Sequence, residues 1–79
     1  MALVHEFEHE PRDRPKIHKP TRCTYFDFLG EDNRRYFQLD TYGSSDREIP
    51  DKVSQSIQFD EGSAARLIQL IKQTYPHLA

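Results

Sequence analysis

An amphipathic stretch over residues 61–74 constrains the fold more than any other feature of the sequence. Its apolar side chains recur at the i, i+3, i+4, i+7 spacing of one helical face and continue one turn further: Ala64, Leu67, Ile68, Ile71 and Tyr75. Asp60 can accept the free backbone N–H groups of a first turn, and Pro76 stops the helix. The sequence therefore predicts one C-terminal helix whose apolar stripe must cover another element.

Three segments before this helix alternate between apolar and polar residues, as β-strands do: 21–29, 34–42 and 53–59. A polar turn over residues 30–33 makes the first two a hairpin. The loop over residues 43–52 could hold a short fourth strand around residues 47–49. We expect the helix to cover a common apolar set: Phe26, Phe28, Phe37, Leu39, Ile57 and Phe59. The prediction is an α+β domain, in which a small antiparallel sheet of three or four strands lies under one C-terminal helix.

Residues 1–20 are expected to form an extended arm before a single domain over residues 21–79. Pro11, Pro15 and Pro20 leave no room between them for a stable helix or a central strand. The first ten residues are acidic. The segment 11–22 carries a charge of +4, although the net charge of the chain is −2.

Small size predicts self-association. A chain of 79 residues buries a modest core, and its one cysteine, Cys23, cannot form an intramolecular disulfide. No cysteine and histidine spacing suits structural zinc, so a homodimer is the support that remains. The first ten residues do not read as a signal peptide, no segment is apolar enough to span a membrane, and a lone cysteine fits the cytoplasm.

The sequence holds no convergent catalytic set, so we expect no enzyme, metal or cofactor. Cys23 has Arg22 beside it but no histidine in the same segment to act as its base. Asp27 and Asp40 are expected on one face of the hairpin, where two carboxylates are too few for a calcium or magnesium site. The i, i+4 pair of histidines near the N-terminus lies in a poor helix candidate and is read as a solvated arm.

Binding is better supported than catalysis. The basic, proline-interleaved segment 11–22 suits phosphate contacts, with a solubilising tail as the equal alternative. Tyr25, Tyr36 and Tyr42 are expected on the sheet face that the helix leaves open, near arginines. Such a face can stack single-stranded bases. The same tyrosines could instead form cross-strand pairs or a protein interface, where tyrosine is also enriched.

Three segments of the chain match one known family: residues 37–43 (FQLDTYG), 47–52 (REIPDK) and 56–71 (SIQFDEGSAARLIQLI). From about Cys23 to Tyr75 the chain resembles the positive-cofactor-four family of transcriptional coactivators and its short bacterial relatives. The resemblance implies a curved antiparallel sheet followed by one helix, homodimerisation and binding of single-stranded DNA. In the second segment Asp51 follows the proline, where the family has glycine and several basic residues.

The resemblance implies five nucleic-acid-binding residues: Arg22, Arg35, Tyr36, Arg47 and Lys52. The expected function is a non-catalytic module that binds single-stranded DNA or RNA, in transcription or DNA maintenance. The alternative is a small protein-interaction subunit, an adaptor or inhibitor of a larger complex, in which the same tyrosines form the contact.

Overall fold

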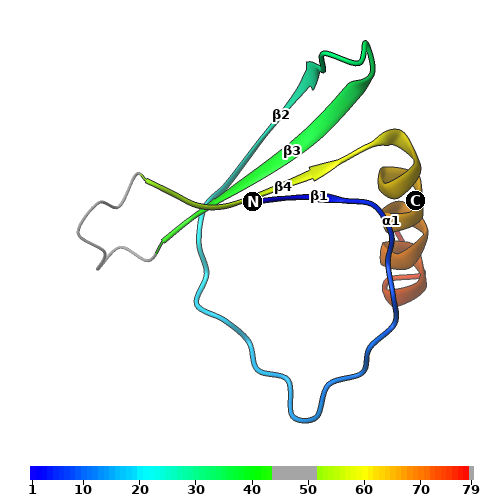
Figure 1. Ribbon diagram of the computed structural model, residues 1–79. Coiled ribbons are helices and arrows are strands. Elements are labelled where there is room, and N and C mark those ends of the chain that lie inside the picture. The colour runs from blue at the N-terminus through cyan, green and yellow to red at the C-terminus, as the bar shows by residue number, and fades with distance from the viewer. Residues whose placement is uncertain (44–51, 79) are drawn as a thin grey trace.

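The computed structural model describes residues 1–43 and 52–78 and shows an α+β fold, one sheet with one helix (Figure 1). The elements in chain order are β1 (Ala2–Val4), β2 (Cys23–Leu29), β3 (Arg35–Tyr42), β4 (Val53–Phe59) and α1 (Glu61–Thr74). The three predicted strands and the predicted helix are confirmed. The short strand expected around residues 47–49 lies outside the described residues.

The sheet is mixed, not antiparallel as predicted. Its order is β1-β4-β3-β2, and the three neighbours β4, β3 and β2 are antiparallel to one another. The extra strand, β1, pairs with β4 in parallel, with Ala2 opposite Ile57 and Val4 opposite Phe59. The first residues of the expected arm therefore complete the sheet, because they offer extended backbone and a half-buried Val4 to the outer edge of β4.

The β2–β3 register places Phe26 and Phe28 on the face opposite to the predicted one. Phe26 pairs with Gln38 and Phe28 with Tyr36, whereas Phe37 and Leu39 face the other way. The expected register assumed a four-residue turn. The observed turn has five residues, 30–34, closed by a 2.7 Å hydrogen bond from the Gly30 N–H to the Arg34 carbonyl. One extra turn residue moves each side chain of a strand to the other face relative to its partner strand.

The helix packs on the sheet face that carries Phe37, Leu39, Ile57 and Phe59, which we call the helix side; the opposite face is the open face. Phe59 is the one buried apolar side chain among the described residues, with 6% of its surface exposed. It is the last residue of β4 and is separated from α1 by Asp60 alone. The end of β4 leads straight into the start of α1 in Figure 1. The core is therefore small and lies at one end of the sheet.

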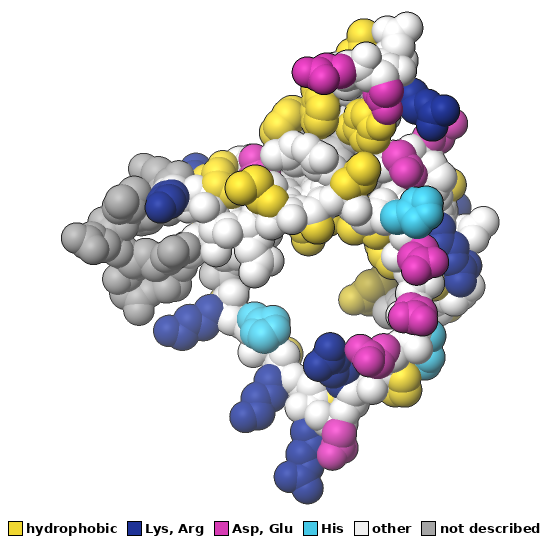
Figure 2. Space-filling view, in the orientation of Figure 1, with side chains coloured by type: hydrophobic (Ala, Val, Ile, Leu, Met, Phe, Trp, Pro, Cys, Tyr) yellow, Lys and Arg dark blue, Asp and Glu magenta, His cyan; other side chains and the backbone are white. Residues whose placement is uncertain are grey.

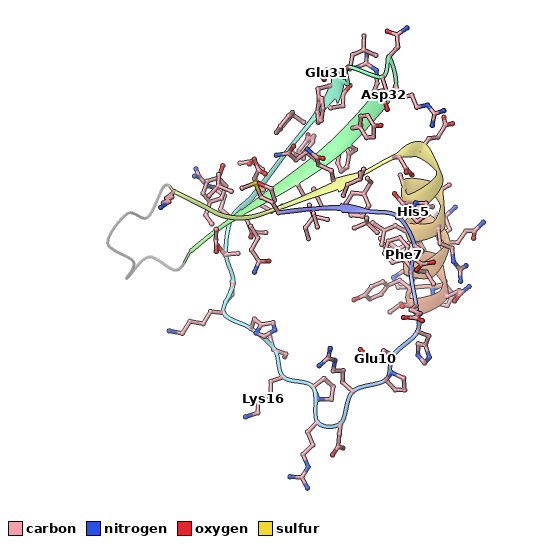
Figure 3. All side chains as sticks on the ribbon, viewed as in Figure 1. His5, Phe7, Glu10, Lys16, Glu31 and Asp32 are labelled. Carbon is pink, nitrogen blue, oxygen red and sulfur yellow. The ribbon has the colours of Figure 1, made fainter. Side chains whose placement is uncertain are left out.

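Between β1 and β2 the chain forms a long exposed arc. Its first part lies against α1, where residues 7–10 line a hollow with Arg66 and Leu70. Residues 11–20 are all exposed and contain neither helix nor strand. Lysine and arginine side chains are spaced along this arc in Figure 2, and Lys16 points away from the rest of the molecule in Figure 3.

A capping box begins α1. The Asp60 carboxylate accepts the Ser63 N–H at 2.8 Å, and the Ser63 hydroxyl accepts the Asp60 N–H at 3.1 Å. The hydrogen bond from the Ser63 backbone holds the pKa of the Asp60 carboxyl below its usual value. The ionised carboxylate is thus the form that the folded protein prefers.

This cap makes stability depend on pH. The pKa of Asp60 is lower in the folded state, so its contribution is present above the unfolded pKa of about 4 and is lost as pH falls through the folded pKa. We expect Asp60→Ala to lower the urea midpoint at pH 7, and to lower it by a smaller amount once the pH has fallen through the folded-state pKa of Asp60. Circular dichroism at pH 7 and below that pKa measures this. Asp60→Asn is the matched control, because it keeps an N-cap acceptor without a titrating group; a pH-independent loss in Asp60→Ala would contradict the assignment.

Candidate nucleic-acid interface

The open face presents a strip of aromatic and polar side chains from three strands. Alternate residues of β2, β3 and β4 point to it: Thr24, Phe26, Phe28, Tyr36, Gln38, Asp40, Ser56 and Gln58. Because α1 packs against the other side of the sheet, it does not cover the strip, in which Phe26 is exposed and the other seven residues are half-buried.

Three aromatic rings form a row at the turn end of this strip. The ring centroids of Phe26 and Phe28 are 5.9 Å apart, and those of Phe28 and Tyr36 are 5.8 Å apart. Tyr36 donates its hydroxyl hydrogen to the Asp32 carboxylate, which raises the pKa of Tyr36 and lowers that of Asp32. Phe26 ends the row and has 45% of its surface exposed, so its ring is the one offered most directly to a ligand.

Amide and hydroxyl side chains hold the centre of the strip. Asp40 Oδ1 accepts hydrogen bonds from the Ser56 hydroxyl at 2.6 Å and from Gln38 Nε2 at 2.8 Å. These hydrogen bonds, chiefly the one from Ser56, lower the pKa of Asp40. Gln58 Nε2 donates in turn to Gln38 Oε1 at 2.8 Å. The network holds the polar groups in fixed positions and gives the Asp40 carboxylate internal donors.

A cation and a tyrosine mark the other end of the strip. The Arg22 guanidinium lies 4.3 Å from the centre of the Tyr42 ring, which is cation–π distance. The Tyr42 hydroxyl is 3.0 Å from Thr24 Oγ1, and Thr21 Oγ1 donates to the Tyr42 carbonyl at 2.5 Å. Lys52 is exposed and lies directly before β4, whose first residue, Val53, pairs with Tyr42. Arg22, Tyr42 and Lys52 thus come from neighbouring strand ends.

The structure places the five nominated residues differently. Tyr36 lies in the aromatic row, and Arg22 and Lys52 lie at the other end of the strip. Arg35 lies on the helix side, where its guanidinium donates to the Asp27 carboxylate at 2.6 Å. Arg47 falls outside the described residues.

The register also changes two other predictions. Tyr25 lies on the helix side, not on the open face, and Asp27 and Asp40 lie on opposite faces of the sheet. The prediction that Asp27 and Asp40 share one face is therefore wrong. Phe26 and Phe28, which the sequence had assigned to the core, replace Tyr25 on the open face. Recognising a five-residue turn over residues 30–34 in the sequence would have placed both phenylalanine rings on the open face.

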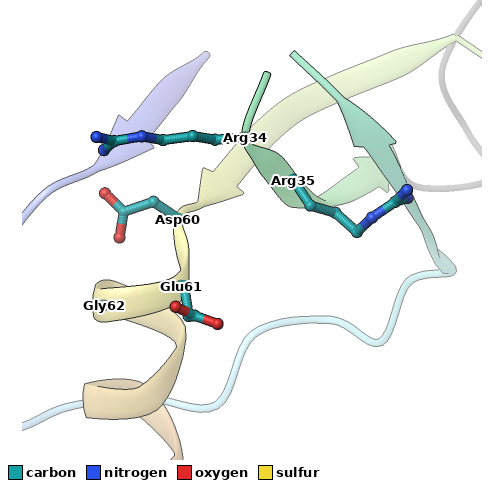
Figure 4. Close-up of a pocket in the computed structure, with 5 residues that line it drawn as sticks. All are labelled: Arg34, Arg35, Asp60, Glu61 and Gly62. Atoms are coloured by element: carbon teal, nitrogen blue, oxygen red, sulfur yellow. The ribbon is translucent and has the colours of Figure 1, made fainter. Parts of the chain in front are cut away.

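A hollow of about 540 Å³ lies between the start of β3 and the start of α1, lined by Arg34, Arg35, Asp60, Glu61 and Gly62 (Figure 4). Two guanidinium groups and two carboxylates share it, so its formal charges cancel. The Asp60 carboxylate already accepts a hydrogen bond from the helix N-terminus. This hollow therefore lacks the excess of positive charge that a phosphate group needs.

Within residues 1–43 and 52–78, no three histidine, cysteine or acidic side chains lie together as a metal site would require. No helix in that part of the chain is long and apolar enough to cross a bilayer. Comparisons with family models, with curated proteins and with solved structures gave no match. The open face of the sheet is therefore the candidate site.

Proposed function

We propose that this chain is a non-catalytic module that binds single-stranded nucleic acid, DNA or RNA, on the open face of its sheet. The observation that carries the proposal is the row of Phe26, Phe28 and Tyr36 on a sheet face without a covering helix. Aromatic rings on an open sheet stack unpaired bases, and they do so with any base because every base has a π-face.

The cations of the chain suit the sugar–phosphate backbone of such a ligand. Arg22 and Lys52 lie at one end of the aromatic and polar strip. The basic segment 11–22 joins the sheet at this same end, where Thr21 is hydrogen-bonded to Tyr42. A strand of nucleic acid that stacks on Phe26 and runs toward Tyr42 would bring its phosphates to these cations.

The sequence resemblance to the positive-cofactor-four coactivators supports the same class of ligand. On this reading the protein acts in transcription or DNA maintenance. Its lone cysteine, Cys23, is exposed and fits a reducing cytoplasm.

The salt dependence of binding tests the proposal. Fluorescence anisotropy with a labelled single-stranded oligonucleotide of about 20 nucleotides, at several salt concentrations, should show a log–log slope near −0.7 per contacted phosphate. Lys52→Ala should make the slope shallower by about one contact. Arg35→Ala is the matched control, because its guanidinium is paired with Asp27 on the helix side and should leave the slope unchanged. No binding at low salt and tens of micromolar protein would end the proposal.

A protein-interaction subunit is the second candidate, and one observation favours it. The centre of the open face carries the carboxylate Asp40, which accepts hydrogen bonds from Ser56 and Gln38, and a negative charge there repels a phosphate group but not a peptide backbone. An adaptor or inhibitor would use the same aromatic row as its contact. Binding to a protein partner that does not weaken steeply with salt, together with no oligonucleotide binding, would favour this candidate.

A further inference from the structure

A hollow of about 460 Å³ lies on the open face, between the strip and the edge strand β1. It is lined by Met1, Ala2, Leu3, Gln38, Ser56 and Gln58. Leu3 pairs with Gln58 across β1 and β4, so its side chain shares the open face with the strip, and 50% of its surface is exposed. The hollow therefore has an apolar wall on one side and amide groups on the other, and the side chains that line it carry no charge.

The strand register joins this hollow to the aromatic row. Phe26 lies opposite Gln38, which in turn lies opposite Gln58. With Leu3 beyond Gln58, one line of side chains crosses all four strands on the open face. A nucleic-acid strand that runs from Phe26 toward Tyr42 passes beside this line. The base after the stacked one can therefore turn across the sheet into the hollow.

Asp40 fixes which way round the two amides lie. The hydrogen bonds from Ser56 and Gln38 lower the pKa of its carboxyl, so at neutral pH it is ionised and can only accept hydrogen bonds. Gln38 must present its Nε2 to Asp40, at 2.8 Å, which directs its Oε1 at Gln58. That oxygen also only accepts, so Gln58 must present its own Nε2, again at 2.8 Å. A flip of either amide would place two oxygen acceptors against each other.

Gln58 keeps two groups for a ligand. One N–H of its Nε2 is donated to Gln38, so the second N–H remains, and its Oε1 accepts no hydrogen bond within residues 1–43 and 52–78. A donor and an acceptor on one amide match the N7 and N6 groups of adenine, which are an acceptor and a donor. On the same edge guanine presents two acceptors, thymine an acceptor beside a methyl group, and cytosine a donor alone. Adenine is the base that satisfies both groups of the amide.

We propose that the hollow recognises an adenine base of the bound single strand, with Gln58 hydrogen-bonded to N6 and N7 of the base and Leu3 packed against its ring. Asp40 is a positioning residue for this contact, because it acts through Gln38 to hold the Gln58 amide in one orientation. The inference rests on the proposed function and adds a base preference to it. It also gives Asp40 a role on a face where its charge alone, which repels phosphate, has none.

Changing one atom of the base tests the contact. Fluorescence anisotropy compares labelled oligo(dA) of about 12 nucleotides with the same strand made from 7-deazaadenine, which has carbon in place of N7. Wild-type protein should bind the 7-deaza strand about 5-fold or more weakly, because stacking is retained and the N7 acceptor is lost. The pair is measured as DNA and as RNA, and the preference is read in the form that binds more tightly.

Variants of the two glutamines of β4 assign the preference to one amide. Gln58→Met removes both amide groups and keeps the length of the side chain, so it should bind the two strands equally. Gln55→Met is the matched control, because Gln55 is exposed on the helix side of the same strand. It should keep the wild-type preference.

Asp40→Asn tests the positioning role. An asparagine side chain both donates and accepts, so it lets the amides flip and should reduce the preference for oligo(dA) over its 7-deaza form. Affinity for oligo(dT) should not fall, because a negative charge is removed from the face. A merely structural role would weaken binding to all these strands alike, and a full preference in Asp40→Asn would remove the positioning role.

The outcomes separate this inference from the proposed function. Equal binding of the two adenine strands by the wild type would overturn the inference and leave the proposed function standing. A preference that persists in a folded Gln58→Met would also overturn it. The wild-type comparison needs no variant, so it decides the matter where Gln58→Met does not fold. Failure to bind any of these oligonucleotides at low salt would instead end the proposed function, and the inference with it.

Discussion

Replacing Phe59 with alanine is expected to abolish the cooperative unfolding transition of this protein. Phe59 is the one buried apolar side chain among the described residues. Truncating a buried phenylalanine costs about 3–5 kcal/mol. A domain of this size derives about 3–5 kcal/mol from its core, so the loss approaches the whole stability. Urea titration of Phe59→Ala, followed by circular dichroism, should show a broad transition or none.

Leu29→Ala is the control for this loss. Leu29 lies on the same side of the sheet as Phe59 but has 57% of its surface exposed, near the turn. We expect it to change stability by less than about 1 kcal/mol. Both variants must be compared at one protein concentration, because self-association would add to apparent stability. A sharp, near-native transition in Phe59→Ala would show that the core is not centred on this residue.

Phe26→Ala carries the second large expected effect, which falls on affinity for single-stranded oligonucleotide. Phe26 is the exposed end of the aromatic row on the open face. Loss of one stacked base costs about 1–3 kcal/mol, which is about 5- to 150-fold in dissociation constant. Fluorescence anisotropy at fixed salt measures it. The effect should be nearly the same at each salt concentration, because stacking involves no phosphate contact.

Leu29→Ala again provides the control, this time because it lies on the same strand as Phe26 but on its other face. Its affinity should match that of the wild type. Circular dichroism of Phe26→Ala should confirm that the fold is retained. Equal losses in both variants would mean that binding depends on β2 as a whole, and an unchanged affinity in a folded Phe26→Ala would remove the aromatic row from the interface.

The helix and three of the strands could be predicted because their signals are local. Asp60 and the apolar spacing after it define the helix within a few residues, and each strand alternates on its own. The pairing of the strands is not local. It depends on whether Arg34 belongs to the turn or to β3, and the observed Asn33, with a φ of 67°, continues the turn by one more residue. That one residue decided which aromatics reach the open face.

The buried side of the helix was only partly predictable. The apolar stripe of α1 is wider than the area that the sheet covers, so sequence spacing alone could not separate inner from outer positions. Leu70, outside the predicted stripe, is half-buried because the arc of residues 7–10 lies against it. Ile68 and Ile71 fit the predicted stripe, but their side chains are exposed. Contacts from a distant segment, not helical periodicity, determined which apolar residues of the helix are covered.

The edge strand β1 has a consequence for how the chain can be cut and joined. Three residues of β1 pair with β4 in parallel, and the arc of residues 5–22 connects them to β2. In effect β1 is a short peptide ligand of the β4 edge, held at high local concentration by its tether. Proteolysis within the exposed arc would turn this intramolecular pairing into ordinary binding, whose strength depends on dilution. The same acceptor edge would then accept any extended chain with a compatible apolar pattern, including the first residues of another molecule.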